Sequence, residues 1–251
     1  MKSILVLALL LSFSPVADNV TTRFALPAGY TRQTNPPQSF GSYLQNLPLK
    51  PAGTHTKTYL GTIANTDAYT AAVVDMSEGK EDLQQCADAV MRLRGEYLYQ
   101  QKRYNEIAFH FVSGFYCDYI HYAEGYRYHN DKWVLKAAKD YSYPNFMRYM
   151  QLVFAYAGTL SLDKELKPVT DVGDLKAGDV LIHGGSPGHC FVVMDVAVNS
   201  AHQKVFMLAQ SFMPAQDIQV LKYNSPWFSL DKPSEIPYGE LINLKYLKRF
   251  E

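Results

Sequence analysis

The chain has 251 residues and an even charge balance, with 24 Lys plus Arg against 24 Asp plus Glu. Because it carries no net field of either sign, nucleic acids and anionic membrane surfaces are poor candidates for its main partners. The length suits one domain with its own hydrophobic core. We therefore expect a single compact unit.

The first 17 residues match the pattern of a secretory signal peptide. Lys2 supplies a positive charge, and residues 4–11 form an apolar run that ends in Ser and Pro. A spanning helix needs roughly 20 apolar residues, about twice this run. The first cysteine is Cys86, so none lies near the cleavage point, around Ala17, to carry a lipid. We expect a secreted or periplasmic protein with no membrane span after signal removal.

Residues 18–53 are rich in Pro, Gly, Asn, Thr and Gln. Because the prolines oppose regular structure, this segment is predicted to be an extended N-terminal arm on the surface of the domain. The domain proper then covers residues 54–251.

The first predicted elements are a buried strand over residues 69–75 and a helix that starts near Glu81 and Asp82 and runs through Tyr99. The apolar stripe of this helix is Cys86, Val90, Leu93 and Tyr97, at helical spacing. Cys86 is therefore expected in the first turn, on the inward face.

Residues 106–113 alternate in character and are predicted to be a strand. The aromatic residues around 114–145 are interpreted as an insertion, and residues 145–156 as a second helix.

The last third predicts three antiparallel strands in a meander, over residues 179–183, 189–196 and 204–210. Side chains of the middle strand should alternate between the two faces of the sheet. One face should carry His189, Phe191, Val193 and Asp195, and the other Cys190, Val192, Met194 and Val196. The Gly-Gly-Ser-Pro-Gly turn before His189 leaves this histidine at the mouth of a strand, a place that suits a general base.

The segment LKAGDVLIHGGSPGHCFVVMDV, residues 175–196, resembles the NlpC-type cell-wall peptidases and their amidase relatives, a papain-like group. The resemblance implies a cysteine nucleophile in the first turn of an earlier helix, a place that Cys86 occupies. It also implies that His189 is the base and that Gln210, on the following strand, orients it. A helix N-terminus should lower the pKa of the Cys86 thiol.

A closer resemblance joins the chain to domain-of-unknown-function family 4846, a group of uncharacterised secreted bacterial proteins. It rests on the segments LQQCADAVMRLRGEYLY, IAFHFVSG, YAGTLSL, GDVLIHGGSPGHCFVVMDV and LAQSFMPAQDIQVL, in this order. This resemblance implies one domain and an exported location. It does not identify a substrate.

Together these patterns predict an α+β fold with an antiparallel sheet or half-barrel packed against the Cys86 helix. The expected activity is a cysteine hydrolase that acts on an amide bond in a cell-wall peptide or another extracellular polymer. Gln85 is a candidate oxyanion donor, and Trp227 a candidate stacking platform for the polymer.

Each candidate also has a structural interpretation. Cys86 can be a buried core thiol, His189 a hydrogen-bonded structural histidine, and Gln210 a partner for backbone groups. A disulfide between Cys117 and Cys190 would leave Cys86 free, but pairing cannot be read from sequence.

No CxxC or HExxH motif occurs in the chain, so we expect no metal and no cofactor. The alternative function is a non-catalytic glycan- or peptide-binding protein of the cell envelope.

Overall fold

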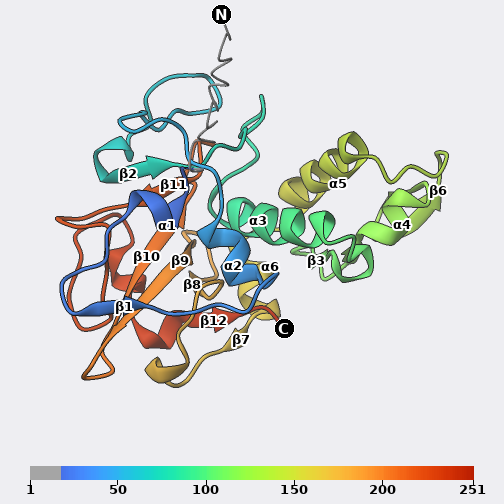
Figure 1. The fold of residues 1–251 in the computed structure, drawn as a ribbon. Coiled ribbons are helices and arrows are strands. Elements are labelled where there is room, and N and C mark those ends of the chain that lie inside the picture. Colours follow the sequence, from blue (N-terminus) through green and yellow to red (C-terminus); the bar gives the residue numbers. More distant parts are fainter. Residues whose placement is uncertain (1–17) are drawn as a thin grey trace, which may run out of the picture.

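An antiparallel sheet of eight strands forms the centre of the described chain, residues 18–251 of this computed structural model. Seven strands follow the order β2-β11-β10-β9-β8-β12-β7, and β1 pairs with the far end of β9 (Figure 1). The expected signal segment, residues 1–17, lies outside the described residues. The strands of the sheet are β1 Tyr30–Arg32, β2 Thr70–Val73, β7 Lys167–Pro168, β8 Val180–His183, β9 His189–Asn199, β10 Lys204–Gln210, β11 Gln219–Leu221 and β12 Leu247–Arg249.

One face of this sheet is covered by helices (Figure 1). Helix α3 packs on β9 and β10, α5 packs on α3, and α4 packs on α5 farther from the sheet. Within residues 18–251, no helix is both long and apolar enough to cross a bilayer. The helices are α1 Val20–Arg23, α2 Phe40–Gln45, α3 Cys86–Gln100, α4 Tyr119–Ala123, α5 Tyr143–Tyr156 and α6 Thr159–Glu165.

Two small hairpins and helix α4 lie in, and directly before, the predicted aromatic insertion around residues 114–145. Strands β3 Ala108–His110 and β4 Tyr116–Asp118 pair with each other, as do β5 Tyr126–Tyr128 and β6 Trp133–Leu135. The ring of Tyr119 lies among several other aromatic rings, including Phe146 of α5 at 5.6 Å between ring centroids. Tyrosines of this region therefore extend the core that the helices form with one face of the sheet.

The predicted α+β class and the three-strand meander are confirmed. Strands β8, β9 and β10 are consecutive and antiparallel, with His183 opposite His189 directly beside the turn of the first hairpin. Side chains of β9 alternate between two cores. Cys190, Val192 and Met194 pack with the helices, whereas Phe191 and Val193 pack with C-terminal residues on the other face.

The predicted alternation is wrong beyond Met194, because β9 carries a β-bulge. Met207 of β10 lies opposite Asp195, but the next residue, Leu208, lies opposite Val193. The extra residue in β9 turns Asp195 to the helical face and Val196 to the other core. A bulge depends on the partner strand, so alternation alone could not predict it.

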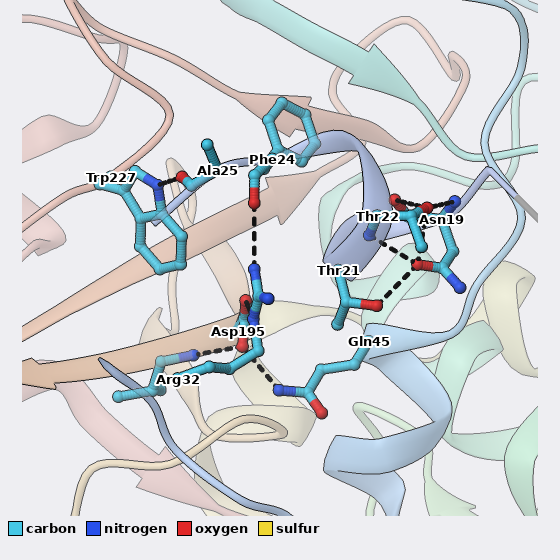
Figure 2. A network of polar contacts seen from close by, with 10 residues as sticks. Asn19, Thr21, Thr22, Phe24, Ala25, Arg32, Gln45, Asp195 and Trp227 are labelled. Carbon is cyan, nitrogen blue, oxygen red and sulfur yellow. Dashed lines mark hydrogen bonds and ion pairs between the residues drawn. The ribbon is translucent and has the colours of Figure 1, made fainter. Parts of the chain in front are cut away.

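The predicted N-terminal arm is more regular and more deeply packed than an extended surface segment. It contains α1, β1 and α2, and Leu44 is fully buried in the helical core. Figure 2 shows the polar contacts that attach it to β9: Arg32 Nε and Gln45 Nε2 each lie 2.6 Å from a carboxylate oxygen of Asp195. A buried carboxylate with two donors thus holds two elements of the arm, a long-range contact that proline content does not reveal.

Candidate active site

Cys86 is the first residue of helix α3, and its side chain is buried. The predicted place in the first turn, on the inward face, agrees with this position. The helix begins four to five residues later than predicted. The carboxylate of Asp82 accepts a hydrogen bond from the backbone N–H of Ala215 (2.6 Å) instead of capping the helix. Asp88 takes the capping role, since its Oδ2 accepts from the backbone N–H of Gln85 at 3.0 Å. The turn before Cys86 is fixed by this bond.

A glycine turn forms the wall opposite the thiol. Cys86 Sγ lies 4.0 Å from the carbonyl oxygen of Gly188, the residue directly before His189. A Cβ atom at Gly188 would lie 2.6 Å from the carbonyl oxygen of Gly185 and even closer to Thr159 Oγ1. Only glycine permits this close approach. The turn can therefore pack against Cys86 of α3 and Thr159 of α6 at the same point.

His189 and Gln210 form the predicted pair on adjacent strands. His189 Nε2 and Gln210 Oε1 are 2.7 Å apart, and both residues are buried. An amide oxygen only accepts, so the neutral ring donates from Nε2 and carries its lone pair on Nδ1. Nδ1 makes no hydrogen bond within residues 18–251. The pair therefore leaves one basic ring nitrogen open.

Aromatic rings enclose His189. Its ring stacks on Tyr238 at 4.6 Å between centroids with an interplanar angle of 17°, and Phe212 lies 5.2 Å away. Burial lowers the pKa of His189 to about 4, and the Gln210 hydrogen bond offsets only part of this effect. His189 is therefore neutral at physiological pH.

The expected lowering of the Cys86 pKa is wrong. Burial raises the pKa of the thiol to about 11, and the nearby carboxyl of Asp88 adds to the effect. Both effects outweigh the helix N-terminus. Among the described residues, no hydrogen bond joins Cys86 Sγ to the ring of His189. At rest, the thiol and the imidazole are thus both neutral.

A cavity of about 520 Å³ opens beside Cys86. Gln85, Cys86, Asp88 and Gly188 are among the residues that line it, whereas His189 and Gln210 are not. The side-chain amide of Gln85 donates to Asp82 Oδ1 at 3.1 Å, so it is engaged locally.

Trp227 is not part of this cavity. It lines a separate hollow of about 300 Å³, and its Nε1–H donates to the carbonyl oxygen of Ala25 at 3.0 Å (Figure 2). The indole thus helps to hold the N-terminal segment against the C-terminal part of the chain.

All three cysteines are free and buried. Cys190 Sγ lies 3.5 Å from the carbonyl oxygen of Cys86, behind the first residue of α3, and no disulfide joins it to Cys117. In residues 18–251, no group of three or more His, Cys, Asp or Glu side chains is arranged to hold a metal ion.

Sequence reasoning missed Asp88, Thr159 and Tyr238. Asp88 could have been found, since an acidic residue at the third helical position is a capping signal. Thr159 and Tyr238 reach the site from distant segments and carry no local signal.

Fold and site together define a mixed α/β protein built on a large antiparallel sheet, with a cavity at the N-terminus of the helix that packs on it. A model of the family described as domain of unknown function (4846) matches residues 20–242. The chain therefore belongs to this family. Searches of curated proteins and of solved structures gave no match.

Proposed function

We propose that the protein is a cysteine hydrolase that cleaves an amide bond, with Cys86 as nucleophile, His189 as general base and Gln210 as the residue that orients His189. The observation that carries the proposal is the hydrogen bond of His189 Nε2 to Gln210, which leaves Nδ1 as the free base. The thiol lies against Gly188, one residue before this histidine. The order of Cys86, His189 and Gln210 along the chain also agrees with the resemblance to the papain-like group.

The chemistry follows from these roles. His189 Nδ1 takes the proton of the Cys86 thiol while the sulfur attacks the substrate carbonyl carbon. The C–N bond then breaks, the proton passes from His189 to the leaving nitrogen, and a thioester remains on Cys86. Water attacks the thioester, with His189 accepting one of its protons. The sulfur leaves and recovers its proton from His189.

Two neutral partners suit this sequence of steps. With a histidine pKa near 4 and a thiol pKa near 11, the proton moves only as the sulfur attacks. Hydrogen bonds of catalytic groups are often long in unliganded sites and tighten when substrate binds. The missing contact between Sγ and Nδ1 is consistent with such a resting state.

We further propose that the protein is exported and that its substrate is a cell-wall peptide or another extracellular polymer. Support for export comes from the N-terminal pattern of residues 1–17. Support for an uncharged part of a polymer as substrate comes from the cavity beside Cys86, which no Lys, Arg or His lines among the described residues.

The proposal is tested by trapping the thioester. The wild-type protein is mixed with soluble cell-wall peptides, quenched in acid and digested, and Cys86 is examined by mass spectrometry. An acyl adduct on Cys86 that is absent from Cys86→Ala, together with new amine termini in the peptides, is the expected result. Peptide cleavage that persists in Cys86→Ala would contradict the proposal.

The second candidate is a non-catalytic glycan- or peptide-binding protein. The enclosed, neutral ring of His189 and its separation from the cavity favour it. Polymer binding that survives the loss of both Cys86 and His189, without any cleavage, would support this function instead.

A further inference from the structure

Large apolar side chains stand exposed around the mouth of the Cys86 cavity. Val112 is 53% exposed, Leu160 41% and Met213 51%, and all three line this cavity. They come from the segment after β3, from α6 and from the loop after β10. Three separate segments thus present apolar surface to one opening. Such a concentration marks a binding surface more often than scattered exposure does.

The cavity itself offers little charge to a ligand. Among the described lining residues none is Lys, Arg or His, and the acidic ones are Asp82 and Asp88. Asp82 Oδ1 already accepts two hydrogen bonds, from Ala215 and Gln85. Asp88 is buried, and burial raises the pKa of its carboxyl to about 8, so it is mostly protonated at neutral pH. An uncharged group fits this lining best.

The backbone of Gly188 also lines the cavity. The Gly188 carbonyl oxygen lies 4.0 Å from Cys86 Sγ, a long and weak contact that a better donor can replace. A peptide N–H is such a donor, whereas a hydrocarbon chain offers none. The combination of an apolar rim with a backbone acceptor favours a peptide over a lipid.

We propose that the cavity beside Cys86 recognises a peptide through an uncharged, apolar side chain that packs between Val112, Leu160 and Met213. That this side chain flanks the cleaved amide rests on the proposed function. The recognition itself does not, because it can be measured without the thiol.

The test measures binding in the Cys86→Ala variant by calorimetry, so that no cleavage interferes. Three N-acetyl tripeptide amides, Ala-X-Ala with X as Leu, Lys or Glu, differ only in the central side chain. We expect the Leu peptide to bind about tenfold more tightly than either charged peptide, since it buries an apolar side chain where the others would have to bury a charge.

Two further variants locate the effect. Adding Leu160→Ser or Met213→Ser should abolish most of the preference for Leu. Adding Leu135→Ser should leave it intact, because Leu135, 62% exposed, lies in β6 and does not line the cavity.

Equal binding of the three peptides, tighter binding of a charged one, or no binding of the Leu peptide at millimolar concentration would overturn the inference. So would methyl octanoate binding as tightly as the Leu peptide, since this ester has a hydrocarbon chain and no N–H donor and would indicate a lipid site. A Leu preference in a protein whose Cys86 forms no thioester would keep the inference and reject the hydrolase.

Discussion

The ring of His189 is buried against the aromatic rings of Phe212 and Tyr238. Its pKa is lowered from 6.5 to about 4 by burial, so the unfolded chain binds a proton more readily between these values. Stability from this residue is therefore present above about pH 6.5 and is lost as the pH falls towards 4.

This difference predicts a loss of about 3 kcal/mol in the free energy of unfolding between pH 6.5 and 4, from His189 alone. Urea unfolding of the wild type and of His189→Gln across this range measures it. The variant should show a smaller loss on acidification. Identical pH dependence in the two proteins would mean that His189 is not buried as a neutral base.

Asp88 should act in the opposite direction. Its pKa is raised from 3.8 to about 8 by burial, so the folded chain holds the proton more firmly and loses stability as the pH rises through this window. Asp88→Asn keeps a neutral side chain, and its stability relative to wild type should grow from pH 5 to pH 8, by about 1.4 kcal/mol for each pH unit at most.

Thermal unfolding at several pH values checks this prediction. Asp75→Asn is the matched control, because Asp75 is exposed. If the two variants show the same pH dependence relative to wild type, the carboxyl of Asp88 is not protonated in the folded protein.

At the scale of elements, the glycine turn between β8 and β9 determines the shape of the site. Gly188→Ala should cost about 2 kcal/mol, because its Cβ would overlap the Gly185 carbonyl and Thr159. Gly158→Ala is the matched control: it lines the same cavity, and a Cβ there meets no atom within 4 Å. Chemical denaturation of both variants should show the larger loss at Gly188. A loss at Gly158 as large as that at Gly188 would contradict the close packing of the turn.

The attachment of β1 and α2 to β9 gives a second prediction. Asp195→Asn removes a buried charge that pairs with Arg32 and accepts from Gln45, and should cost about 2 kcal/mol. Glu106→Gln, in the exposed pair with Arg103, should cost less than about 1 kcal/mol. Comparable losses measured in urea would show that the arm does not depend on Asp195.

The elements that sequence predicted well are those whose pattern is local. The stripe of α3 and the alternation of β8, early β9 and β10 follow from side-chain period alone. The predicted start of α3 is too early because Asp82 accepts a hydrogen bond from the backbone N–H of Ala215, 133 residues later in the chain, and does not cap the helix. The bulge at Met194 likewise depends on the register with β10.

At the scale of the whole molecule, the candidate site brings together three distant parts of the chain. Helix α3, the turn before β9 and helix α6 meet around the cavity, and Gln210 supports His189 from β10. The place of Cys86 in the first turn of α3 and the contact between His189 and Gln210 could be predicted from the sequence. The protonation states could not, because they depend on burial and on Asp88.

The roles of Cys86 and His189 are tested by the rate at which iodoacetamide labels Cys86 at pH 7 in the wild type and in His189→Ala. Labelling of Cys86→Ala gives the background, and cooperative unfolding shows that each variant is folded. A thiol with a pKa near 11 is almost fully protonated at this pH, so fast labelling requires a base. If His189 is the base, the wild type should react about 100-fold faster than His189→Ala, with Gln210→Ala between them. Equal rates in the folded wild type and His189→Ala would contradict it.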